Sequence, residues 1–157
     1  AEGGVRVVND GLVRDLGVRP DQLDEATVHE ARELERRVTH YRGGRAAIAL
    51  ADRVVILVDD GLATGYTARA AIAALRRVGA SRVILAVPVA PQESIEALRS
   101  IADEVVVVET PARFFGVGQA YRVFAQTSDE EVLAVLEGAS RPGPVPRRAL
   151  PDDERTP

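Results

Sequence analysis

The sequence predicts an α/β protein built around a parallel sheet. Three apolar, mostly β-branched runs, at residues 54–58, 82–87 and 105–108, alternate with two segments of helical spacing at residues 67–78 and 91–101. Strands that are separated by helices form right-handed βαβ crossovers, which place successive strands parallel. Because each run is apolar at consecutive positions, we expect all three strands to be buried on both faces.

Composition excludes several classes of protein. The 157 residues are 46% hydrophobic and 28% charged, which is typical of a globular chain that buries a core. No apolar run is long enough to span a bilayer and no signal segment opens the chain, so we expect a cytoplasmic protein with no membrane partner. Cysteine and lysine are absent, which excludes disulfides, thiolate nucleophiles and Schiff-base chemistry. The net charge of −4 argues against nucleic acid as a partner.

The first 45 residues lead into this core. Residues 5–8 form a short apolar run before an Asn-Asp-Gly turn, so we expect a strand there. A helix is expected at about residues 25–41, with Asp24 as its N-cap. Gly43 and Gly44 are expected to end that helix.

The later elements carry their own start and stop signals. Arg76 and Arg77 occupy the last turn of the helix at residues 67–78, and Gly79 follows as a C-terminal stop. Pro91 opens the next helix. Ser128 and Glu131 form a capping box that starts a last helix, which ends at about residue 137. Five prolines among residues 138–157 predict a disordered tail.

The segment between the first strand and its helix carries the candidate chemistry. Asp59 and Asp60 come directly after the strand, and in an open α/β sheet ligands bind outside the carboxyl ends of the strands. Two adjacent carboxylates fit the vicinal hydroxyls of a ribose and a nearby divalent cation.

The residues that follow the acidic pair predict a phosphate cradle. Backbone N–H groups at residues 63–67 have no helical partner and lie at the positive end of the helix dipole. A phosphate satisfies both needs. Gly65 allows close approach of the backbone, and the Thr64 and Thr67 hydroxyls can donate as well.

Other readings of this loop are weaker. A Walker loop is excluded because the spacing is one residue short and lysine is missing, and a dinucleotide fingerprint requires glycine where this loop has aspartate. An ordinary strand-to-helix turn with an acidic N-cap is the remaining alternative. His29 and His40, the two histidines, are expected to be solvated or to cap a helix.

At residues 54–67 the sequence VVILVDDGLATGYT resembles the signature of the type I phosphoribosyltransferases. Further on, PARFFGVGQAYRVFAQTSDEEV resembles a bacterial branch of stand-alone predicted phosphoribosyltransferases. The resemblance covers about residues 1–137, and it implies a Rossmann-like parallel-sheet fold. It divides the domain into a hood or lid segment at residues 1–45 and a βαβ core at residues 46–137.

The resemblance also implies a function and its residues. A phosphoribosyltransferase of this type binds Mg²⁺ and phosphoribosyl diphosphate and transfers the phosphoribosyl group to a nitrogen acceptor such as a nucleobase. The catalytic and metal-binding roles fall on Asp59 and Asp60, and a homodimer is one assembly that the family allows. Substrate-binding roles fall on Gly61, Ala63, Thr64, Gly65, Tyr66 and Thr67, and on Phe115, which aligns with an aromatic residue that stacks on the base. A core aromatic is the alternative for Phe115.

Departures from the family leave a second hypothesis open. Hypoxanthine-type enzymes carry an acidic candidate base where this chain has Ala63, although adenine enzymes also have alanine there. They carry a metal-binding Asp in a region where residues 119–122 here offer no carboxylate. The chain begins where the family's N-terminal strand–helix unit would already have ended, so we expect an N-terminally incomplete fold. Arg42 and Arg45 lie in the segment where the family has a lid that closes over diphosphate, and they are expected either to stabilise charge there or to be solvent-exposed cations. A non-catalytic binding module or an inactive truncated fragment is therefore the alternative function.

Overall fold

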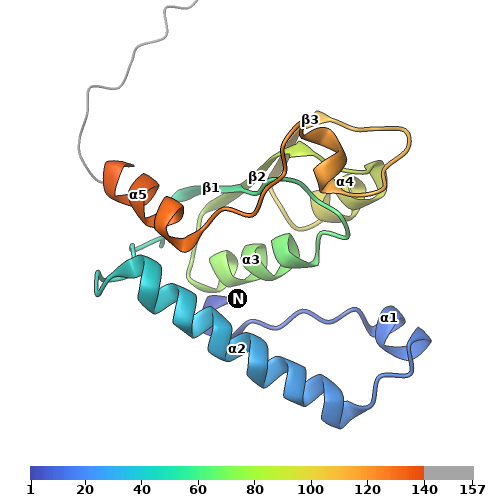
Figure 1. The fold of residues 1–157 in the computed structure, drawn as a ribbon, viewed down its shortest axis with the longest axis horizontal. Helices are drawn as coiled ribbons and strands as arrows, with labels where there is room; N and C mark the ends of the chain where they lie inside the picture. Colours follow the sequence, from blue (N-terminus) through green and yellow to red (C-terminus); the bar gives the residue numbers. More distant parts are fainter. Residues whose placement is uncertain (140–157) are drawn as a thin grey trace, which may run out of the picture. The chain divides into compact units, whose positions relative to one another are not determined.

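The computed structural model of the chain describes residues 1–139, which fall into two compact units. The first unit covers residues 1–125 and the second begins at Gln126. Among the described residues, no helix is both long and apolar enough to cross a membrane. The elements of the first unit, in order, are η1 (Glu2–Gly4), α1 (Asp10–Asp15), α2 (Pro20–Arg42), β1 (Val54–Val58), α3 (Tyr66–Arg77), β2 (Arg82–Val89), α4 (Gln92–Arg99), β3 (Glu104–Glu109) and η2 (Val117–Ala120) (Figure 1).

The three strands form one parallel sheet in the order β1-β2-β3. Between β1 and β2, Val54 pairs with Arg82, and between β2 and β3, Ile84 pairs with Glu104. Each strand is joined to the next by a helix, α3 between β1 and β2 and α4 between β2 and β3. The predicted α/β class and the parallel sheet are confirmed.

The core lies on one face of this sheet. Val83, Leu85 and Val87 of β2 are at most 3% exposed and pack with Ile72 of α3 and Leu98 of α4. Both crossovers run in the same direction across the sheet, so a single hand places both helices on the same side. The apolar cluster therefore forms between β2 and the two helices.

The prediction that the strands are buried on both faces was wrong. On β1, Val54 is 60% exposed and Val58 is 71% exposed, and on β3 Val108 is 85% exposed. β1 and β3 are the two outer strands, and α3 and α4 pack against the opposite face. A run of consecutive β-branched residues is therefore compatible with a strand that is covered on one side only.

The N-terminal segment differs from the prediction at two places. Residues 5–8 form no strand, and the short helix α1 follows, capped by Asn9, whose side-chain oxygen accepts a hydrogen bond from the Leu12 N–H at 3.0 Å. Helix α2 begins at Pro20, not near residue 25. Proline at the first helical position and the Gln22 side chain, which accepts from the Arg19 N–H at 3.0 Å, start the helix earlier than Asp24. Its predicted end is confirmed, because Gly43 adopts a left-handed conformation.

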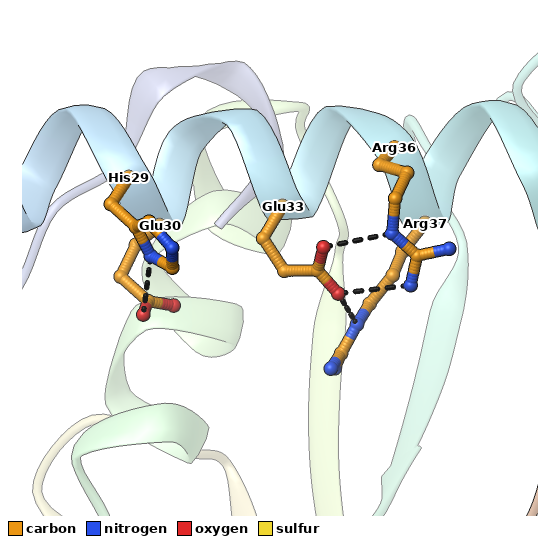
Figure 2. Close-up of polar contacts among 5 residues, drawn as sticks. All are labelled: His29, Glu30, Glu33, Arg36 and Arg37. Atoms are coloured by element: carbon orange, nitrogen blue, oxygen red, sulfur yellow. Dashed lines mark hydrogen bonds and ion pairs between the residues drawn. The ribbon is translucent and has the colours of Figure 1, made fainter.

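On the surface of α2, two arginines form hydrogen bonds to one carboxylate, that of Glu33. Glu33 accepts hydrogen bonds from Arg36 Nε at 2.8 Å and from Arg37 Nε at 2.7 Å (Figure 2). These guanidinium groups lower the pKa of Glu33 to about 2. On the preceding turn the His29 side chain is 80% exposed and its Nδ1 lies 3.7 Å from Glu30, so this histidine is solvated, as predicted.

The second unit contains α5 (Asp129–Ala139). Its predicted capping box is confirmed, since the Glu131 side chain accepts from the Ser128 N–H at 2.8 Å and the Ser128 hydroxyl accepts from the Glu131 N–H at 3.2 Å. Most of the predicted tail, residues 140–157, lies outside the described residues.

Candidate functional site

The candidate site is the loop that joins β1 to α3 at the carboxyl edge of the sheet, which we call the β1–α3 loop (residues 59–65). A cavity of about 300 Å³ opens over it. The cavity is lined by the loop, by the first residues of α3 and by Val117 of η2. The structure thus brings together eight of the nine residues predicted for the site: Asp59, Asp60, Gly61, Ala63, Thr64, Gly65, Tyr66 and Thr67.

Two glycines allow this loop to pack as it does. A Cβ atom on Gly61 would lie 2.7 Å from a methyl group of Val117 and 2.8 Å from a methyl group of Val89. Gly65 has a φ of 72°, in the left-handed region that glycine tolerates, and a Cβ there would lie 3.0 Å from Leu98. The sequence suggested that Gly65 lets the backbone come close to a bound phosphate. The structure adds that both glycines are required by the core behind the loop.

Three hydrogen bonds hold the loop against the rest of the unit. The buried Leu62 donates its N–H to the Val89 carbonyl at 2.9 Å. The Ser94 hydroxyl of α4 donates to the Ala63 carbonyl at 2.6 Å, and the Tyr121 hydroxyl donates to the Asp60 carbonyl at 2.6 Å. Sequence reasoning missed Ser94 and Tyr121. A signal existed for Ser94, because it sits four residues before Leu98 and so shares the buried face of its helix.

The start of α3 is left open to a ligand. Gly65 is its N-cap and supplies no side chain, and its first turn contains no acidic residue. In the part of the chain that the structure describes, no backbone N–H of residues 63–68 donates a hydrogen bond to another group. Exposed Thr64 and Thr67 add hydroxyl groups beside these donors. The arrangement is a set of unpaired donors at the positive end of a helix, which suits an anion.

The acidic pair lies at the other end of the cavity. Asp59 is half-buried and Asp60 is exposed, and the Asp60 N–H donates to the Asp59 carboxylate at 3.0 Å. Burial raises the pKa of Asp59, and the negative charge of Asp60 raises it further, although that N–H acts in the opposite direction. A cation or sugar hydroxyls at this end would favour the ionised pair.

Mg²⁺ fits the donors that this site supplies. Among the described residues, no group of three or more His, Asp or Glu side chains gathers in a way that could hold a metal ion by protein ligands alone. Mg²⁺ is commonly bound by one or two carboxylates together with substrate phosphates and water. Asp59 and Asp60, next to a phosphate-binding loop, offer that combination.

Phe115 is not among the residues that line the cavity. Its residue is 89% exposed, so the alternative that it is a core aromatic was wrong. The loop that carries it is closed by Gln119, whose side chain accepts from the Phe115 N–H at 2.8 Å and donates to the Arg113 carbonyl at 3.0 Å. Stacking of Phe115 on an acceptor stays a prediction.

A second hollow, of about 500 Å³, lies on α2 and is lined by Arg32, Glu35, Arg36, Thr39 and His40. It is larger but shallow, and long, polar side chains of a single helix form it. Nearby, Arg42 pairs with Glu2 at 2.8 Å, and Arg45 donates to backbone carbonyls at the end of α2. In this structure both arginines are engaged at the end of α2, and neither lines the loop cavity. The loop cavity therefore remains the better candidate.

Comparisons with known proteins indicate the family of this chain. Residues 3–122 match the phosphoribosyl transferase domain family. Proteins from two strains of Mycobacterium tuberculosis, whose assignment as phosphoribosyl transferases is itself provisional, are 47% identical over 140 residues, 89% of this chain. The uracil phosphoribosyltransferase of Caulobacter sp. (strain K31) is 45% identical over 58 residues, 37% of this chain and 28% of that protein. The chain spans only 32% of the length of the Mycobacterium proteins.

The crystal structure of TT1426 from Thermus thermophilus superimposes with a TM-score of 0.66 at 36% identity, covering 83% of this chain and 61% of that one. A Rossmann-like parallel sheet with an acidic pair and an open helix start after its first strand is typical of one class of α/β proteins, those with a ligand-binding edge at the carboxyl ends of the strands. Within that class, the chain belongs to the type I phosphoribosyltransferase family.

Proposed function

We propose that this chain binds Mg²⁺ and phosphoribosyl diphosphate and transfers the phosphoribosyl group to a nitrogen acceptor such as a nucleobase. The observation that carries the proposal is the cavity in which the acidic pair and the unpaired N–H groups face one ligand-sized space. The 5′-phosphate is received by the N–H groups of residues 63–67 and by the Thr64 and Thr67 hydroxyls. Asp59 and Asp60 accept hydrogen bonds from the ribose 2′- and 3′-hydroxyls.

In this reaction the acceptor nitrogen forms a bond to the anomeric carbon as the bond to diphosphate breaks. Little covalent chemistry is required of the protein, which fixes the sugar at both ends and so converts a bimolecular step into an oriented one. The acidic pair supports the positive charge that develops on the sugar ring. Asp59 and Asp60 would hold Mg²⁺ together with the ligand, and the ion would supply charge neutralisation of the departing diphosphate.

Calorimetric titration of the full chain with phosphoribosyl diphosphate in the presence of Mg²⁺ tests the proposal. We expect saturable binding that is lost in the Asp59→Asn/Asp60→Asn variant. The raised pKa of Asp59 means that folding disfavours its ionised form. A variant without that charge is therefore expected to unfold at the same or a higher temperature. Binding that is unchanged in a folded double variant would refute the assignment.

Two observations favour a second candidate, a regulatory module that binds the same ligand without turnover. Ala63 cannot act as a general base, and residues 119–122 supply no carboxylate to the cavity. Release of diphosphate with candidate bases separates the two functions. A chain that binds phosphoribosyl diphosphate but releases no diphosphate with any base would support the regulatory module.

A further inference from the structure

The β1–α3 loop is held near each end by a hydroxyl from a distant part of the chain. The Ser94 hydroxyl donates to the Ala63 carbonyl at 2.6 Å across 31 residues. The Tyr121 hydroxyl donates to the Asp60 carbonyl at 2.6 Å across 61 residues. Neither side chain belongs to the sequence signature of the loop, and neither is among the residues that line the cavity.

Because the peptide bond is planar, a contact that fixes a carbonyl also fixes the direction of the next residue's N–H. In a trans peptide, the carbonyl of one residue and the N–H of the next point in opposite directions. When Ser94 fixes the Ala63 carbonyl toward α4, the Thr64 N–H points away from α4. In the same way, the contact from Tyr121 fixes the direction of the Gly61 N–H.

A third peptide follows the same rule. The Gly65 carbonyl accepts from the Arg69 N–H at 2.9 Å within the first turn of α3. The Tyr66 N–H is therefore directed out of the helix start. Among the described residues, neither the Thr64 N–H nor the Tyr66 N–H has a hydrogen-bond partner, so an anion is the group that would complete them.

We infer that Ser94 and Tyr121 are positioning residues. Ser94 holds the Ala63–Thr64 peptide so that the Thr64 N–H is aimed at a bound 5′-phosphate before it arrives, and Tyr121 holds the Asp60–Gly61 peptide beside the acidic pair. This inference rests on the proposed function and extends it to two residues outside the loop. Donors that are oriented in advance bind more tightly than donors that must be ordered on binding. Ser94 is only 7% exposed, and it is the single polar residue in the buried class among the described residues.

The alternative is a purely structural role, in which the buried Ser94 hydroxyl uses the Ala63 carbonyl only as a hydrogen-bond acceptor and does not affect ligand binding. A matched control on the same helix separates the two roles. Ser100 also donates its hydroxyl to a backbone carbonyl, that of Ala97 at 2.9 Å, but it lies at the C-terminal end of α4. Ser100→Ala therefore removes a hydroxyl-to-carbonyl bond that is local and exposed, without touching the loop.

The test is calorimetric titration of the full chain, and of Ser94→Ala, Tyr121→Phe and Ser100→Ala, with ribose 5-phosphate. We expect affinity to fall by about three- to tenfold in Ser94→Ala and in Tyr121→Phe, which corresponds to the loss of one hydrogen bond. Ser100→Ala should bind as the unmodified chain does. Ser94→Thr, which keeps the hydroxyl, should recover affinity relative to Ser94→Ala.

A second readout does not depend on ligand. In NMR relaxation of the free protein, the Thr64 amide should have a lower order parameter in Ser94→Ala than in Ser100→Ala, because its peptide plane is no longer fixed. Equal affinity and equal order parameters in Ser94→Ala and Ser100→Ala would overturn the inference while the proposed function stands. If the unmodified chain fails to bind ribose 5-phosphate or phosphoribosyl diphosphate, the proposed function fails and this inference fails with it.

Discussion

At the scale of single residues, Gly61 links the site to the core. Its Cα faces methyl groups of Val89, at the end of β2, and of Val117, which lines the cavity. A side chain at this position must therefore displace one of the two valines. Displacement of Val117 would change the cavity wall, whereas displacement of Val89 would disturb a fully buried position.

Gly61→Ala is expected to lower the free energy of unfolding by about 1–3 kcal/mol, because it overpacks this contact. Val117→Ala in the same chain should recover part of the loss, since it removes the nearest methyl group. Denaturant unfolding measures both. Gly138→Ala, at a helix position with no neighbour within 4 Å, is the control and should not destabilise the protein. A neutral Gly61→Ala would contradict the packing described here.

Residues of the site were predictable when they belong to the loop itself. Asp59, Asp60 and Thr64 lie within six positions of one another in the sequence, so their proximity is a local property. Ser94 and Tyr121 reach the loop only through the fold, and no local pattern indicates which carbonyl a hydroxyl will meet.

At the scale of elements, Asp103 ties α3 to two strands. One carboxylate oxygen accepts from the Val83 N–H of β2 and from Arg76 of α3, both at 2.6 Å, directly before β3 begins. The Val83 N–H, and next the Arg76 guanidinium, lower the pKa of Asp103. A lowered pKa means that the ionised form is favoured in the folded state. Its contribution to stability is present above the unfolded pKa of about 3.9 and is lost as the pH falls through the lower folded value.

Asp103→Asn keeps the shape of the side chain but removes the charge. We expect a lower midpoint of thermal unfolding at pH 7, and a smaller fall in that midpoint between pH 7 and pH 3 than in the unmodified chain. Glu104 is the next residue and forms an exposed ion pair with Arg82. Glu104→Gln breaks that pair and should change the midpoint of thermal unfolding little. Thermal unfolding across this pH range, followed by circular dichroism, compares the three proteins. An Asp103→Asn curve parallel to that of the unmodified chain would show that this carboxylate does not couple the elements.

Element type was predictable, and element boundaries less so. Helix α2 starts earlier than its apolar spacing suggested, because Pro20 and Gln22 start it without an apolar residue. Strand β2 continues to Val89, beyond the predicted end, through Pro88. Its pairing with β1 has already ended at Ala86, so the missing N–H of proline breaks no bond with that neighbour.

At the scale of the first unit, the sheet carries its core on one face. Leu85 is fully buried between β2 and the helices, whereas Val108 is 85% exposed on β3. Sequence reasoning expected both strands to be buried on both faces. Consecutive apolar residues do not reveal which face the crossover helices cover, because that depends on strand order and on the hand of the connections.

Leu85→Ala should therefore lower the free energy of unfolding by about 2–5 kcal/mol, since it leaves a cavity in the core. Val108→Ala should change it by no more than about 0.5 kcal/mol, because this side chain is mostly exposed already. Chemical denaturation of the two variants measures the difference. Equal losses in both would mean that the outer face of the sheet is covered in solution.

The central claim is that the β1–α3 loop receives the 5-phosphate of a phosphoribosyl ligand. The most direct measurement is a titration of the isotope-labelled chain with ribose 5-phosphate, followed by amide NMR shifts. We expect the largest shifts to fall on residues 63–67, with smaller shifts at Asp59 and Asp60. Shifts concentrated instead on the α2 hollow around Arg32 and His40, with the loop amides unmoved, would contradict it.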